Sequence, residues 1–261
     1  MTDVNYARQT VLATREWVPG KLFSFTVSRP DGFNFTAGQF ARLGLPASGE
    51  PGAEPSVWRA YSLVNAPHQS PLEFYAVVVP DGEFSPRLAA LKPGDDLFID
   101  RTLFGFLTIE RFEPGGTLWL VATGTGLSAY LSMLNDPATW SSFERIILVH
   151  GVRTCAELAY QDQIATWQAA AGTAPFNARF TYLPIPTQET LPDTPKARLT
   201  TLIENGDLEH LAETSFDPDT HKIMLCGNPA MVTDARALLK DRGFAAGRRG
   251  VPGNLAVENY W

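Results

Sequence analysis

The pattern of apolar residues changes near residue 110, and this change limits the folds open to the chain. Before it, short segments rich in β-branched and aromatic residues are separated by turns such as residues 92–95, Lys-Pro-Gly-Asp. After residues 114–116, Pro-Gly-Gly, strand-like runs alternate with helical ones. Regularly spaced short strands are typical of antiparallel barrels and sandwiches, of which we favour the barrel, whereas alternation with helices requires crossovers and a parallel sheet. The sequence therefore predicts two domains: an antiparallel β-barrel over residues 1–110 and a parallel-sheet α/β domain over residues 111–261.

The same patterns predict the individual elements. In the first part, strands are expected over residues 12–18, 22–29, 39–45, 58–64, 72–79, 96–99 and 104–109. One short helix is expected over residues 86–91, with Ser85 as its N-cap. In the second part, strands are expected over residues 118–122, 145–150, 178–185 and 222–226. Helices are expected over residues 127–134, 156–171, 199–208 and 229–242.

The composition excludes several classes of protein. The net charge of -7 argues against a general nucleic-acid binder, because such domains carry a basic surplus. Two cysteines, Cys155 and Cys226, are too few for an iron–sulfur cluster, and the four histidines lack metal-site spacing, so no metal is expected. No apolar run is long enough to cross a bilayer, and the N-terminus has no apolar targeting segment. We expect a cytoplasmic protein without nucleic-acid or membrane partners.

Residues 59–62, Arg-Ala-Tyr-Ser, place a cation, an aromatic ring and a hydroxyl together at the end of an expected strand. This combination suits a flat ring with a phosphate tail, such as a flavin nucleotide. Gly82 and Ser85 lie at the start of the expected short helix, where unpaired backbone N–H groups can bind a pyrophosphate. An ordinary strand end and an unoccupied surface helix would show the same residues, so both interpretations stay open.

A turn with glycines at Gly124 and Gly126 and an alanine at Ala129 matches G-x-G-x-x-A between an expected strand and helix. Such glycines let the backbone approach the pyrophosphate of a dinucleotide, although tight packing of the turn would select them too. The next strand ends at residues 150–153, His-Gly-Val-Arg, without the acid that would hold the ribose 2'-hydroxyl of NAD. Arg153 and Arg198 are candidates to pair with the 2'-phosphate of NADP.

Two further features lie near the C-terminus. Residues 226–229, Cys-Gly-Asn-Pro, follow an expected strand at the edge where open α/β sheets bind ligands. The Cys226 thiol could touch a nicotinamide ring, or it could be an ordinary buried apolar residue. The chain ends in Tyr260 and Trp261, which could stack on a ligand or pack on the protein.

In order and spacing, these motifs resemble those of the bacterial ferredoxin (flavodoxin)–NADP reductases. The likeness includes residues 59–62, 82–85, 123–126 and 226–229 and the aromatic C-terminus, and it extends from about residue 8 to Trp261. It implies a barrel that binds FAD and a second domain that binds NADPH. It also implies hydride transfer from NADPH to the flavin, followed by single-electron transfer to a separate ferredoxin or flavodoxin. A monomer is expected.

The resemblance also assigns roles to particular residues. Contacts with FAD are expected at Arg59, Ala60, Tyr61, Ser62, Tyr75, Val77, Gly82, Phe84, Ser85, Thr123, Tyr260 and Trp261. Contacts with NADP are expected at Gly124, Thr125, Gly126, Arg153, Arg198, Cys226 and Gly227. Catalytic roles are expected for Tyr61, Ser62, Cys226, Glu258 and Tyr260. In this scheme Tyr61 and Tyr260 cover opposite flavin faces, Ser62 lies near flavin N5 and Glu258 relays a proton.

The chain departs from the family at one motif. Where relatives often have Ser/Thr-Arg-Glu, residues 185–189 read Ile-Pro-Thr-Gln-Glu, so one cation for the 2'-phosphate is lost. Because Arg153 and Arg198 remain, NADPH is still expected over NADH.

For the electron carrier, an acidic protein is expected to dock on basic residues near the C-terminus. These residues are Lys240, Arg242, Arg248 and Arg249. Three alternative functions stay open: a flavin reductase, the reductase component of an oxygenase, and a non-catalytic flavin subunit of a larger electron-transfer complex.

Overall fold

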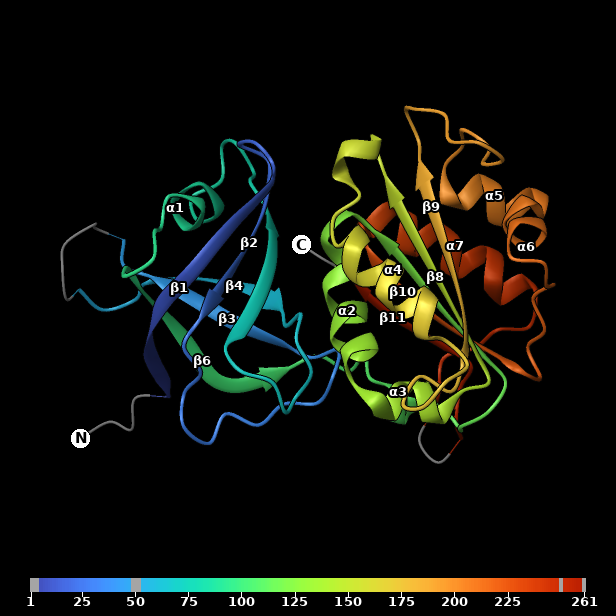
Figure 1. Cartoon of the computed structure of the whole chain (residues 1–261), viewed down its shortest axis with the longest axis horizontal. Coiled ribbons are helices and arrows are strands. Elements are labelled where there is room, and N and C mark those ends of the chain that lie inside the picture. The colour runs from blue at the N-terminus through green and yellow to red at the C-terminus, as the bar shows by residue number, and fades with distance from the viewer. Residues whose placement is uncertain (1–4, 48–52, 249–250, 260–261) are drawn as a thin grey trace.

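The chain folds into two sheets that lie next to each other (Figure 1). The structure is a computed structural model and describes residues 5–47, 53–248 and 251–259. The first sheet has six strands in the order β4-β3-β6-β1-β2-β5, paired antiparallel. Its strands are β1 (Tyr6–Val18), β2 (Leu22–Val27), β3 (Phe40–Leu45), β4 (Val57–Ser62), β5 (Leu72–Val77) and β6 (Asp96–Phe104). A bridge between Leu63 and Phe74 joins the ends of this order and closes the sheet into a barrel.

The second sheet is parallel and has five strands in the order β11-β10-β7-β8-β9. Its strands are β7 (Thr117–Thr123), β8 (Arg145–Val152), β9 (Arg179–Pro186), β10 (His221–Gly227) and β11 (Leu255–Asn259). Strands β7, β8 and β10 are buried along almost their whole length, as expected for parallel strands covered on both faces. The predicted fold class is therefore confirmed. The proposed boundary at residue 110 falls in the connection between β6 and β7 and stays a prediction.

Helices cover both faces of the parallel sheet. One face packs against α2 (Leu127–Asn135), α3 (Pro137–Ser142) and α4 (Gln161–Ala170). The other packs against α5 (Leu199–Asn205), α6 (Asp207–Leu211) and α7 (Pro229–Asp241). The barrel has only α1 (Ser85–Ala89) among its described residues. None of the helices in the described ranges has the length and apolar character to cross a membrane.

Helix α2 lies between the two sheets and joins them (Figure 1). Ser132 Oγ donates to the Asn65 carbonyl at 2.8 Å, and Asn135 Nδ2 donates to the Val64 carbonyl at 3.0 Å. Farther along the interface, Tyr160 donates its hydroxyl proton to Glu73 Oε1 at 2.8 Å. These contacts put part of the barrel and one face of the parallel sheet into a single apolar core.

Several element predictions are wrong at their boundaries. Strand β6 continues without a break to Phe104, and the predicted strand over residues 104–109 is a loop followed by a 3-10 turn, η1 (Ile109–Arg111). Helix α4 begins only at Gln161, because Tyr160 has a left-handed φ of 60° and a separate 3-10 turn, η3 (Cys155–Glu157), precedes it. Gly206, with φ of 84°, ends α5 and separates it from α6.

Ser85 is not an N-cap. Phe84 occupies the cap position of α1 without a side-chain hydrogen bond, and Ser85 is the first helical residue. The Ser85 hydroxyl instead accepts the Val79 N–H at 2.9 Å and so closes the turn around Gly82. By contrast, Asn228 does cap α7, because its side chain accepts the N–H groups of Ala230 and Met231.

Candidate functional site

A cavity of about 400 Å³ opens between the barrel and the start of α2. Its lining residues come from β3, β4, β5, the turn before α1, α2 and β11. They are Phe40, Arg59, Ala60, Tyr61, Ser62, Tyr75, Val77, Val79, Gly82, Glu83, Phe84, Ser85, Thr125, Ser128, Glu258 and Asn259. The cavity thus brings together most of the residues that the sequence assigned to FAD.

Strand β4 forms one wall of the cavity. Burial raises the pKa of Tyr61 to about 12, and the nearby Arg59 opposes that shift only in part. The Tyr61 ring is therefore neutral at physiological pH, and its centroid lies 5.9 Å from that of Phe84. Arg59 is exposed and donates to the Trp58 carbonyl at 2.8 Å, whereas Ser62 is buried at 3% exposure. The wall thus combines an aromatic surface with a cation at its rim.

Strand β5 and the turn before α1 form a second wall. Tyr75 is 2% exposed, and its hydroxyl has no hydrogen-bond partner within the described residues. Burial raises the pKa of Tyr75, and Glu157 raises it further. Gly82 lies where a Cβ would come within 3.0 Å of the Val79 carbonyl oxygen, so a side chain would crowd this turn. A polar hydroxyl held without a partner beside a cavity is suited to a ligand contact.

Glu258 reaches the cavity from the parallel sheet. Burial raises its pKa to about 7, although the Phe106 N–H lowers it by donating a hydrogen bond. Its Oε1 atom has no partner within the described residues. Glu258 is therefore present in both protonation states near neutral pH, which is a property of groups that exchange protons.

The glycine turn after β7 packs tightly against the turn after β10. A Cβ on Gly126 would lie 2.6 Å from the Cys226 carbonyl oxygen, and one on Gly227 would lie 2.3 Å from Thr123 Oγ1. Thr123 Oγ1 in turn accepts the Asn228 N–H at 2.8 Å. Gly124 differs, because a Cβ there would meet no atom within 4 Å. Packing thus accounts for two of these glycines, while Gly124 borders open space.

His150 holds the glycine turn after β7 through a hydrogen bond to its backbone. Its Nε2 atom lies 3.1 Å from the Gly124 carbonyl oxygen, and the residue is fully buried. Burial lowers the pKa of His150 to about 4, so the ring is neutral and donates from Nε2. The sequence assigned no role to His150, and its position at the end of β8, next to the glycine turn, is the signal that would have indicated one.

Of the residues assigned to NADP, only Thr125 belongs to the lining of the cavity. Arg153 and Arg198 are exposed, in the loop after β8 and at the start of α5. Their segments meet where a Cβ on Gly151 would lie 2.9 Å from Leu199 Cδ1. Both arginines therefore stand at the carboxyl edge of the parallel sheet.

Other assigned residues are placed differently. Cys226 is fully buried in the core with α2 and is not part of the cavity lining, and β10 is not the last strand, because β11 pairs beyond it. Tyr260 and Trp261 lie outside the described residues. Phe40 was missed, but the register of β3 with β4 would have found it, because Phe40 pairs with Ser62. No group of three metal-binding side chains occurs within the described ranges.

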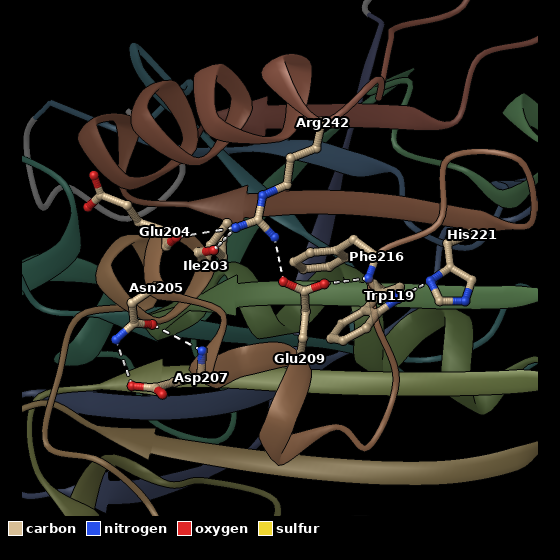
Figure 2. A network of polar contacts seen from close by, with 9 residues as sticks. All are labelled: Trp119, Ile203, Glu204, Asn205, Asp207, Glu209, Phe216, His221 and Arg242. Carbon is tan, nitrogen blue, oxygen red and sulfur yellow. Dashed lines mark hydrogen bonds and ion pairs between the residues drawn. The ribbon is translucent and has the colours of Figure 1, made fainter.

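The structure describes three of the four basic residues expected to dock the carrier, Lys240, Arg242 and Arg248. Helix α7 starts just after the carboxyl end of β10 and ends at Asp241, so Lys240 and Arg242 lie at its C-terminal end. Figure 2 shows Arg242 pointing inward to Glu209, with which it forms an ion pair. It also donates to the Ile203 carbonyl. Arg242 therefore stabilises the fold instead of presenting a free charge, and Arg249 lies outside the described residues.

Comparison with known proteins adds an independent finding. A family profile described as "Oxidoreductase NAD-binding domain" matches residues 120–237. The chain is 38% identical to ferredoxin–NADP reductase A of Sorangium cellulosum over 256 residues, 97% of this chain and 89% of the relative. It is also 38% identical to the flavodoxin/ferredoxin–NADP reductase of Escherichia coli strain K12, over 94% of this chain and 99% of that one.

The fold has a close match among solved structures. A crystal structure of a ferredoxin NADP+ reductase from Neisseria gonorrhoeae, with bound FAD and NADP, superimposes with a TM-score of 0.89 at 33% sequence identity. The match covers 99% of this chain and 100% of the other. Because these similarities extend over both sheets and nearly the whole sequence, this chain belongs to the family of bacterial ferredoxin/flavodoxin–NADP reductases.

Proposed function

We propose that this protein is a FAD-dependent oxidoreductase that transfers electrons from NADPH to a ferredoxin or flavodoxin. The observation that carries the proposal is the cavity, in which Tyr61 of the barrel and Glu258 of the parallel sheet line the same space. A site between two domains suits a cofactor that must meet a coenzyme on one side and a protein carrier on the other. The family relationship supports the same activity.

The residues present fit a flavin. The cavity has an aromatic wall at Tyr61 and a cation at its rim in Arg59. Two buried polar atoms without partners in the described chain, Tyr75 Oη and Glu258 Oε1, belong to residues that line it. When bound, FAD accepts a hydride from NADPH and releases the two electrons one at a time. Arg59 and the turn ending at Ser85 would hold the pyrophosphate.

Each side chain around the cavity would have a different role toward the flavin. The neutral ring of Tyr61 would provide a flat surface that excludes water from one face of the flavin. Ser62 places a hydroxyl at the buried end of β4, where it would orient the ring edge. Glu258 holds a proton near neutral pH and would exchange it as the ring changes its protonation. Tyr260 and Trp261 would cover the ring and the adenine from the other side.

The coenzyme would bind at the carboxyl edge of the parallel sheet. Gly124 leaves open space for a pyrophosphate, and Thr125 and Gly126 complete the turn that leads directly into the N-terminus of α2. Arg153 and Arg198 would pair with the 2'-phosphate. Gly227 and Cys226 would stand beside the nicotinamide through their backbone, because the Cys226 side chain is buried. In the cell we propose a cytoplasmic monomer that meets its carrier as a separate protein.

The test is to purify the protein and record its visible spectrum. We expect a flavin spectrum that NADPH bleaches under anaerobic conditions, and reduction of added ferredoxin or flavodoxin in steady state. A colourless protein that does not take up FAD would contradict the proposal. Rapid reduction of free FMN without reduction of either carrier would instead identify a flavin reductase.

A further inference from the structure

The loops after β8 and β9 remain paired beyond the ends of the two strands. Thr187 donates its N–H to the Val152 carbonyl at 2.9 Å, and Gln188 donates to the Arg153 carbonyl at 2.8 Å. The side chain of Glu189 then crosses to the other loop, where its Oε2 accepts the Cys155 N–H at 2.6 Å. These three hydrogen bonds hold a carboxylate against the segment that carries Arg153.

Glu189 therefore supplies the acid that is absent from the sequence after β8. In nucleotide-binding sheets of this type, a carboxylate at the end of the second strand accepts the ribose 2'-hydroxyl of NAD, whereas arginines receive the 2'-phosphate of NADP. Here the acid comes from the neighbouring loop, and it stands on the same short segment as Arg153.

The charges around Glu189 reinforce its position. The Cys155 N–H and thiol hydrogen bonds lower the pKa of Glu189, and Lys196 lowers it further. The carboxylate is therefore ionised and close to Lys196, which lies two residues before Arg198. Glu189 thus stands close to Lys196 and on the paired loops that carry Arg153. A second carboxylate, Glu157, lies on the Arg153 segment, where its Oε2 accepts the Arg153 N–H at 3.3 Å.

We infer that Glu189 sets the coenzyme preference of this site by opposing the 2'-phosphate and accepting the 2'-hydroxyl of the unphosphorylated coenzyme. The inference rests on the proposed function, because it requires a nicotinamide coenzyme at this edge of the sheet. Gln188, the residue before Glu189, is uncharged, so the adjacent side chain supplies no cation to offset the Glu189 charge.

The test compares Glu189→Gln with Asp193→Asn. The glutamine keeps an oxygen for the Cys155 N–H and loses the charge. Asp193 is exposed in the same loop with φ of 57°, which asparagine tolerates, so its variant loses the same charge without touching the Arg153 segment. Calorimetry of the FAD-loaded protein would measure the affinity for 2'-phospho-AMP and for AMP, with kcat/KM for NADPH and NADH as a second readout.

For Glu189→Gln we expect roughly five- to tenfold tighter binding of 2'-phospho-AMP, because one unit charge near a phosphate in a solvated site is removed. Binding of AMP should weaken, because the neutral amide is a poorer acceptor for the 2'-hydroxyl, and the NADPH to NADH ratio of kcat/KM should rise by a similar factor. Asp193→Asn should change either affinity by less than about twofold.

Three outcomes would overturn the inference. Equal effects on both nucleotides in Glu189→Gln would mean that the carboxylate does not distinguish them. An equal response of Asp193→Asn would mean that any nearby charge acts in the same way. Normal NADPH oxidation with an unchanged NADPH to NADH ratio of kcat/KM in Glu189→Gln would reject the role of Glu189 alone. The proposed function itself would fail only if the wild-type protein bound neither nucleotide and oxidised neither coenzyme.

Discussion

Glu258 and Cys226 are register neighbours in the parallel pairing of β11 with β10, so their side chains point to the same face of the second sheet. Cys226 is covered by α2 and fully buried, whereas Glu258, on the edge strand, reaches the cavity beside the barrel. An edge strand in this position lets the parallel sheet contribute a carboxylate to a site built mainly by the barrel.

Replacing Glu258 with glutamine should change how stability depends on pH. Burial raises the pKa of Glu258 to about 7 from an ordinary 4.5, so its protonated form is favoured by folding. Its stabilising contribution is complete below about pH 4.5 and is lost as the pH rises through 7. Relative to wild type, Glu258→Gln should gain on the order of 2 kcal/mol between pH 5 and pH 8.5, measured by urea unfolding of the flavin-free protein.

If Glu258→Gln instead lost stability relative to wild type between pH 5 and pH 8.5, the charged form of Glu258 would have a partner that stabilises it in the folded protein. In the FAD-loaded enzyme the same variant should lose the pH dependence of turnover near neutrality, because a glutamine cannot exchange a proton.

Replacing His150 with glutamine should make the protein less sensitive to acid. Burial lowers the pKa of His150 to about 4 from 6.5, so folding favours the neutral ring. The stability that this provides is complete above pH 6.5 and is lost as the pH falls from 6.5 towards 4. The amide of glutamine can still donate to the Gly124 carbonyl and does not titrate, so urea midpoints at pH 7 and pH 5 should differ less than in wild type.

His221 also has a pKa lowered by burial, so the variant should retain part of the acid sensitivity. An unchanged difference between the two midpoints in His150→Gln would contradict the prediction.

Alanine at Gly126 and at Gly124 should have unequal effects. At Gly126 the added Cβ would lie 2.6 Å from the Cys226 carbonyl oxygen, a backbone atom that cannot rotate away, so we expect a loss of about 1–3 kcal/mol. At Gly124 there is free space, and only the positive φ of 53° opposes the substitution, at about 1 kcal/mol. Thermal unfolding should rank wild type first, Gly124→Ala second and Gly126→Ala last. The reverse order of the two variants would mean that the packing of the two turns is looser than described.

Replacing Tyr61 with leucine should weaken FAD binding. The aromatic ring borders the cavity, and a ring-to-ring contact is worth about 0.5–1.5 kcal/mol, so the dissociation constant should rise roughly two- to tenfold. Tyr61→Phe keeps the ring and should change the constant by less than about twofold. Titration of flavin-free protein with FAD, followed by fluorescence, would measure all three proteins. Equal effects of the two substitutions would assign the role to the hydroxyl rather than to the ring.

Local pattern was enough to predict both sheets. Segments rich in β-branched and aromatic residues, separated by turns, indicate the barrel strands, and the buried runs at β7, β8 and β10 require cover on both faces. Strand β11 was missed, because Leu255–Asn259 ends in polar residues and becomes a strand only through its pairing with β10. The start of α4 was placed too early, because the left-handed backbone at Tyr160 leaves no local signal in a bulky residue.

Sequence motifs were sufficient to predict the lining residues of the site where a single strand or turn supplies several of them. Residues 59–62, 82 and 84–85 do line one cavity. The carboxylate of Glu189 was not foreseen at the end of β8, because it arrives from the next loop, 34 positions from Cys155. Ser128 was missed because it lines the cavity only once α2 is docked on the barrel. Contacts set by the packing of distant elements have no signature in the spacing of residues along one segment.

The position of α2 bears on how such proteins can be recombined. By sequence the helix belongs to the second domain, but Ser132 and Asn135 donate to carbonyl groups of the barrel, and its apolar residues share a core with Val64. A chimera that joins this barrel to the coenzyme half of a relative at residue 110 would therefore place unmatched surfaces against each other. A junction after Asn135 would keep α2 with the barrel on which it rests, but it would separate β7 and α2 from β8 and β10, with which they share the parallel sheet and its core. Either junction therefore leaves one side of the helix against a surface from the relative.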